Sequence, residues 1–201
     1  MFVEAIVLFA IALFLALMEI EVEGKFGWAE KIPTWYRTTG LAGRIWGLMM
    51  SGKPLTGYHL FLNGVLLTML HFGFTLGLEW SLRVELLLIA KYFALAVFWD
   101  FLWFVFNPYY GISNYKKENV WWFSKSRWMF GIFPLDYLAG LGCSMIPAYF
   151  GGIVKQQLTL IGLLVGFTFL SIVVAPLYRR WYAFMRRRDD RNLAGVIHRL
   201  P

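Results

Sequence analysis

Acidic and imidazole side chains occur within otherwise apolar segments of this sequence, where an unpaired charge is costly. Asp100 stands in a run of aromatic residues, Glu19 and His59 belong to two other apolar segments, and Asp136 lies near the start of a fourth. Carboxylates and histidine together are ligands for divalent metals, and a buried carboxylate can act as an acid or base. We therefore predict that Asp100, Glu19, His59 and Asp136 are catalytic, with Glu19, His59 and Asp100 as ligands of a divalent metal.

Spacing places several of these residues on shared helix faces. Glu19 and Glu23 are four residues apart, as are His59 and Asn63, and side chains at this spacing are neighbours on a helix. Because Glu23 falls at the end of its apolar segment, we expect it to lie in water beyond the membrane. The residues predicted to bind and orient a substrate at a similar depth are Asn63, Asn107 and Trp103.

Two classes of metal-dependent enzyme are disfavoured because the sequence lacks their motifs. No Glu-x-x-His pair and no His-rich box is present, which argues against a di-iron site of the desaturase type. Asp100 also has no second acid four residues later, as the repeated-aspartate motif of polyprenyl-transferring enzymes would require. The leading interpretation is a carboxylate- and histidine-lined site near the cytoplasmic leaflet. This site would bind a lipid-like or amphipathic substrate and could also modify it. A divalent metal is the candidate cofactor.

Two other functions stay open, and the sequence does not decide whether the protein is an enzyme. Glu85 lies on nearly the same helix face as Asp100, so a small proton or ion transporter could use both carboxylates. Gly162 and Gly166 form a small-xxx-small pattern that allows another helix to approach closely. This pattern suits a homo- or hetero-oligomer, or a non-catalytic subunit of a larger membrane complex.

The composition indicates that membrane-spanning helices position these residues. Of the 201 residues, 59% are hydrophobic and 15% are charged, against about 45–50% and about 25% in soluble proteins. With a mean hydropathy of +0.59, these values exclude a water-soluble enzyme or nucleic-acid-binding module, so no nucleic-acid partner is expected. We predict an all-α polytopic membrane protein, a single bundle with five spans at about residues 3–20, 58–78, 84–106, 134–150 and 158–178.

The distribution of Lys and Arg predicts an orientation in the cell membrane. Sixteen of the nineteen fall in the first and third connections and the tail, two fall in the other connections, and Lys91 lies within the third span. Because basic residues are retained on the cytoplasmic side, the N-terminus is predicted outside and the C-terminus inside. We expect Lys91 to form an ion pair with a glutamate of another helix.

Two of the basic connections are long and rich in tryptophan. Residues 27–52 and 113–131 interleave aromatic rings with Lys and Arg, a pattern typical of segments in the headgroup plane of the inner leaflet. The basic cytoplasmic tail, residues 179–201, is expected to add attraction to anionic lipid of the bilayer.

Three strings carry a resemblance to known sequences. They are EVEGKFGWAEKIPTW (residues 21–35), LTGYHLFLN (55–63) and WDFLWFVFNP (99–108). In these strings the chain resembles a group of small uncharacterised prokaryotic multi-pass membrane proteins, over roughly its first two-thirds. The resemblance implies no activity, catalytic residue or cofactor.

Overall fold

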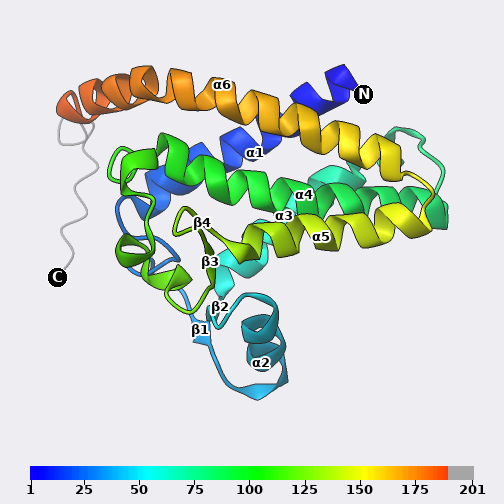
Figure 1. Cartoon of the computed structure of the whole chain (residues 1–201), viewed down its shortest axis with the longest axis horizontal. Coiled ribbons are helices and arrows are strands. Elements are labelled where there is room, and N and C mark those ends of the chain that lie inside the picture. Colours follow the sequence, from blue (N-terminus) through cyan, green and yellow to red (C-terminus); the bar gives the residue numbers. More distant parts are fainter. Residues whose placement is uncertain (190–201) are drawn as a thin grey trace.

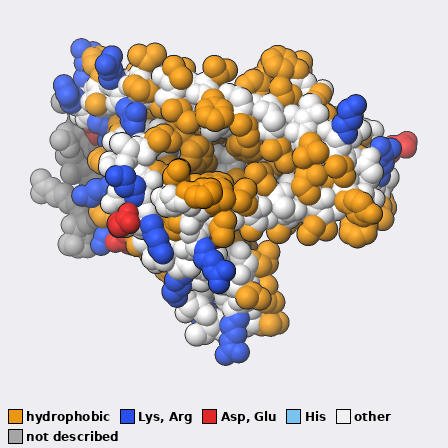
Figure 2. All heavy atoms as spheres, in the orientation of Figure 1, with side chains coloured by type: hydrophobic (Ala, Val, Ile, Leu, Met, Phe, Trp, Pro, Cys, Tyr) orange, Lys and Arg blue, Asp and Glu red, His pale blue; other side chains and the backbone are white. Residues whose placement is uncertain are grey.

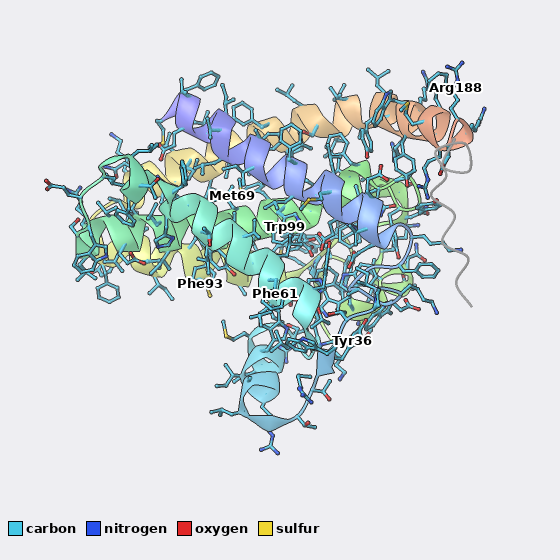
Figure 3. The ribbon with its side chains drawn as sticks, turned by 180° about the vertical axis from the view of Figure 1, so that it is seen from behind. Tyr36, Phe61, Met69, Phe93, Trp99 and Arg188 are labelled. Carbon is cyan, nitrogen blue, oxygen red and sulfur yellow. The ribbon has the colours of Figure 1, made fainter. Side chains whose placement is uncertain are left out.

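The computed structural model describes residues 1–189 of the chain. Within this range the fold is a bundle whose long helices run along the longest axis of the molecule, with helix α3 on the rear face (Figures 1 and 3). The helices of the bundle are α1 (Phe2–Glu23), α3 (Gly57–His71), α4 (Leu82–Phe106), α5 (Leu135–Phe150) and α6 (Val154–Arg187).

Four of the helices in residues 1–189 are long and apolar enough to cross a membrane. They are α1, α3 together with its 3-10 extension η1 (Phe72–Leu76), α4 and α6. This architecture confirms the prediction of an all-α polytopic membrane protein. The fourth predicted span, residues 134–150, is formed by α5, which has 16 residues and is therefore about 24 Å long. That length falls short of the ~30 Å hydrocarbon core, so the five-span topology and its orientation stay predictions.

Local sequence accounts for the ends of the central helix, α4. The Ser81 hydroxyl accepts a hydrogen bond from the Val84 N–H and so caps the first turn. The helix ends at Phe106, because Pro108 disfavours helical geometry at Asn107, the residue before it, which is extended. From Phe98 onward almost every side chain of α4 is buried, and this end of the helix forms the centre of the core.

The first connection carries a small helix that projects from the bundle. Helix α2 (Gly40–Met49) lies between the two strands of a short antiparallel pair, β1 (Tyr36–Arg37) and β2 (Leu55–Thr56), and stands away from the long helices (Figure 1). Its exposed apolar side chains include Leu41, Ile45 and Leu48. In Figure 2 hydrophobic side chains occupy one side of this projection and Lys and Arg the other. Such asymmetry is what a helix in the membrane interface requires.

The third connection folds back onto the bundle. Residues 112–134, hereafter the cap segment, contain the short 3-10 helices η2 (Ile112–Asn114), η3 (Lys117–Asn119) and η4 (Trp121–Phe123) and the pair β3 (Trp128–Met129) with β4 (Phe133–Pro134). Trp121 is exposed, but Val120, Trp122 and Phe123 are buried in the main core. The centre of this segment therefore packs against the helices and covers the end of α4.

The last helix is longer than the span expected from the sequence. The predicted span ended at residue 178, whereas α6 continues without a break past Pro176 to Arg187. Part of the predicted basic tail is thus helical, and residues 190–201 lie outside the described residues. The attraction of the tail to anionic lipid stays a prediction.

Candidate metal centre

A cluster of buried polar side chains lies where α1 ends and α3 begins. Glu19 and Glu23 of α1 are 7% and 6% exposed, and His59 of α3 is 7% exposed. One possible ligand atom from each of the three lies within 4.8 Å of the other two, and His59 Nε2 is 3.8 Å from Glu19 Oε1. Figure 3 shows side-chain oxygen atoms gathered near Trp99, in the space between α1 and α3.

These side chains surround a cavity of about 20 Å³. Because a water molecule needs about 10–15 Å³, the cavity has room for one water or one metal ion but not for a substrate. Three carboxylates and an imidazole from three helices converge on this volume, together with four aromatic side chains. The lining residues are Glu19, Glu23, Trp28, His59, Asp100, Trp103, Phe104 and Trp122.

An unusual turn after α1 organises one wall of the cavity. Trp28 and Ala29 have φ values of 56° and 57°, a left-handed conformation that is uncommon for residues other than glycine. The turn brings the Ala29 N–H to 2.5 Å from Glu23 Oε1 and stacks the Trp28 ring on His59, with 4.2 Å between ring centroids. Backbone conformations of this kind persist where the surrounding structure enforces them, and they concentrate at functional sites.

His59 is oriented by the residue that caps its helix. Thr56 Oγ1 accepts a hydrogen bond from the His59 backbone N–H at 3.1 Å and lies 2.7 Å from His59 Nδ1. When Nδ1 carries the proton and donates to Thr56, Nε2 presents its lone pair toward Glu19. A histidine that ligates a metal has this arrangement, with its second ring nitrogen held by a hydrogen bond.

Asp100 completes the acidic lining from α4. The Tyr137 hydroxyl of α5 donates a hydrogen bond to Asp100 Oδ2. Nearby, the Trp103 indole is 3% exposed and its Nε1–H has no acceptor among the described residues. An unpaired buried donor is unfavourable. Because Trp103 lines the cavity, an oxygen atom held there would satisfy it.

A second polar cluster centres on Asp136 and joins the cap segment to the first connection. Asp136 accepts hydrogen bonds from Ser51 at 2.8 Å, from Ser126 at 2.7 Å and from Lys53 at 3.3 Å. The Lys53 side chain is 3% exposed, and its ammonium lies 3.7 Å from the centre of the Phe123 ring. Burial lowers the pKa of Lys53, and the negative charges of Asp100 and Asp136 oppose this shift.

The structure brings together some of the predicted site residues and separates others. Glu19, His59, Asp100 and Trp103 line one cavity, whereas Asp136, Asn63 and Asn107 do not. Asn63 donates to the His59 carbonyl and accepts from the Tyr92 hydroxyl, both at 2.7 Å. Asn107 donates to the Gly24 carbonyl at 2.8 Å and accepts from the Tyr109 N–H at 2.9 Å. Asn107 thus joins the end of α4 to the end of α1, and Asn63 joins α3 to the middle of α4.

The expectation that Glu23 lies in water is wrong. The chain reverses at Gly24, where φ is 61°, and the residues that follow cover the Glu23 carboxylate. The sequence does contain a local indication that Glu23 belongs to the site, because Glu23 shares a helix face with Glu19, four residues earlier.

The polar groups at the opposite end of the bundle form separate pairs. Glu85 lies 3.2 Å from His71 Nε2 and 3.3 Å from Trp80 Nε1, and it precedes Asp100 by about 22 Å along α4. Lys91 forms an ion pair with Glu4 of α1, which confirms the predicted pairing with a glutamate of another helix.

The fold and the cluster together define an α-helical membrane protein with a buried Glu/Glu/His cluster. No protein-family model matches the chain, and no curated protein and no solved structure matches it.

The close packing of Trp122 on the first connection leads to a testable expectation. A Cβ atom added at Gly27 would lie 2.0–2.4 Å from atoms of the Trp122 ring, so Gly27→Ala must displace a ring that lines the cavity. We expect a loss of about 1–3 kcal/mol in unfolding free energy, measured by chemical unfolding in mild detergent. Gly64→Ala in α3 is the control, because its Cβ would meet nothing within 4 Å. Equal stability of the two variants would contradict tight packing here.

Proposed function

We propose that the protein binds one divalent transition-metal ion through Glu19, Glu23 and His59. The ion would serve a site that binds, and chemically modifies, a lipid-like or amphipathic substrate from the cytoplasmic leaflet. The observation that carries this proposal is the convergence of three ligand atoms within 4.8 Å on a cavity with room for one ion.

Charge balance supports the binding of a cation. Glu19, Glu23 and Asp100 line the cavity, and the nearby Lys53 is paired with a different carboxylate, Asp136. Three carboxylates crowded in a poorly solvated volume repel one another. A divalent ion would offset most of this charge. Mixed carboxylate and imidazole ligands suit zinc, manganese or iron, whereas calcium and magnesium prefer oxygen ligands alone.

The groups around the proposed ion suit acid–base chemistry. Three protein ligands leave a coordination position open for a water or a substrate oxygen, and a bound metal makes such a water more acidic. Asp100 lines the same cavity and could accept a proton from such a water, while the Tyr137 hydroxyl holds the Asp100 carboxylate in place. The unpaired Trp103 N–H can donate to the same oxygen.

The residues that line the cavity support entry of substrate from the cytoplasmic side. Trp28 and Trp122 are lining residues that belong to the first and third connections. Both connections are rich in Lys and Arg, which the positive-inside rule assigns to the cytoplasm. Because the cavity holds no more than an ion or a water, a substrate would reach the metal when these indoles move aside.

Metal content measured on the purified protein tests the proposal. After expression with zinc, manganese and iron supplied, native mass spectrometry and elemental analysis are expected to give about one metal per chain for the wild type. His59→Gln removes the nitrogen ligand and should lower the content to about a tenth or less. The matched control is Glu21→Gln, because Glu21 lies on α1 between the two proposed glutamate ligands but is exposed. A wild type without metal, or equal losses in both variants, would overturn the proposal.

A further inference from the structure

A second and larger cavity lies at the opposite end of the bundle, where α1, α4 and α6 all begin (Figure 1). Its volume is about 370 Å³, which is within the range of about 300–1,000 Å³ typical of small-molecule sites. One wall is apolar and is formed by Val84, Leu87, Ile153 and Leu160. Charged and amide side chains also line this cavity, so it suits an amphipathic ligand.

The charged groups that line this cavity include more cations than anions. Glu4 forms ion pairs with both Lys91 and the N-terminal ammonium of Met1, and all three residues line the cavity. Arg83, in the first turn of α4, is exposed and forms no ion pair with any described residue. The guanidinium of Arg83 can therefore bind a phosphate in bidentate geometry.

A buried amide supplies an independent indication of a ligand. Gln157 lines the cavity and is 1% exposed. Its Nε2 donates a hydrogen bond to the Ala90 carbonyl at 3.1 Å, but its Oε1 has no donor among the described residues. A buried acceptor without a donor is unfavourable. A ligand that donates a hydrogen bond would satisfy it.

We propose that this cavity binds an anionic phospholipid with a hydroxyl-bearing headgroup, as in phosphatidylglycerol. The phosphate binds Arg83, a headgroup hydroxyl donates to Gln157 Oε1, and the acyl chains pack against the apolar wall. Phosphatidylcholine fits less well, because its headgroup carries no net charge and has no donor for Gln157. This site is separate from the proposed metal centre and does not depend on it.

Lipid retention measured by native mass spectrometry tests this site. The delipidated full chain is incubated with equimolar phosphatidylglycerol and phosphatidylcholine of the same acyl composition. We expect about one phosphatidylglycerol per chain, at roughly tenfold preference over phosphatidylcholine. Arg83→Gln and Gln157→Leu should each weaken its retention by about tenfold, since each removes one of the proposed polar contacts.

Three controls make the result decisive. Arg44→Gln changes an exposed arginine on α2 and should leave retention unchanged. Glycerol 3-phosphate should not displace the lipid at equimolar concentration, because it cannot use the apolar wall. Arg83→Gln should also keep the metal content of the wild type. Equal retention of both lipids, or wild-type retention in both Arg83→Gln and Gln157→Leu, would overturn the proposal.

Discussion

Glu19→Gln is expected to change the stability of the protein in opposite directions with and without a divalent metal. In the metal-free protein the substitution removes one of three crowded carboxylates, so the unfolding free energy should rise by about 1 kcal/mol or more. With metal at a hundred times its dissociation constant, the wild type should gain about 2.7 kcal/mol. Glu19→Gln should gain almost none of this, because it lacks a ligand.

Chemical unfolding in mild detergent, first with a chelator and then with added zinc or manganese, measures both effects. Glu21→Gln keeps all three proposed ligands and should follow the wild type under both conditions. Equal stabilisation of the wild type and Glu19→Gln by metal would rule out Glu19 as a ligand. A metal-free Glu19→Gln less stable than the wild type would show that repulsion between the carboxylates is not the dominant effect.

Lys53→Met is expected to destabilise the protein strongly. It removes the buried ammonium that lies 3.3 Å from Asp136 and leaves that carboxylate with hydrogen bonds from Ser51 and Ser126. Loss of one partner of a buried ion pair typically costs about 3–5 kcal/mol. We expect the unfolding free energy to fall by about 3 kcal/mol, the lower end of this range, because the Asp136 side chain is still 18% exposed. Unfolding in detergent again provides the measurement.

Two further variants separate the loss of the ion pair from a general effect of removing a lysine. Lys117→Met changes an exposed lysine of the cap segment and should leave stability nearly unchanged. Adding Asp136→Asn to Lys53→Met removes the unpaired charge and should recover part of the loss, as a double-mutant cycle would quantify. If Lys53→Met matched Lys117→Met, the pair would contribute little to stability.

The helices of this protein could be predicted because their signals are local. Long apolar runs specify α1, α4 and α6, and Pro108 specifies where α4 ends. The convergence of Glu19, His59 and Asp100 was also accessible, because polar groups inside a membrane face one another to avoid lipid.

Other parts of the site depend on contacts between distant segments, which no local pattern reveals. Asp136 is 83 residues from Lys53 and 85 from Ser51 in the sequence. Residues 27–52 and 113–131 both alternate aromatic rings with basic residues, so the sequence predicts an interfacial position for both connections alike. Only packing against α4 distinguishes the buried Trp122 from the exposed Trp121.

The unequal lengths of neighbouring helices have a consequence for the lipid around the protein. Helix α5 has 16 residues and α6 has 34, or about 24 Å and about 51 Å. If α5 crosses the membrane as predicted, a hydrocarbon layer of ~30 Å would have to thin beside it, while α6 would have to tilt or extend past the headgroups. The hydrophobic mismatch would then differ from one side of the bundle to the other, and we expect the stability of the protein to depend on bilayer thickness.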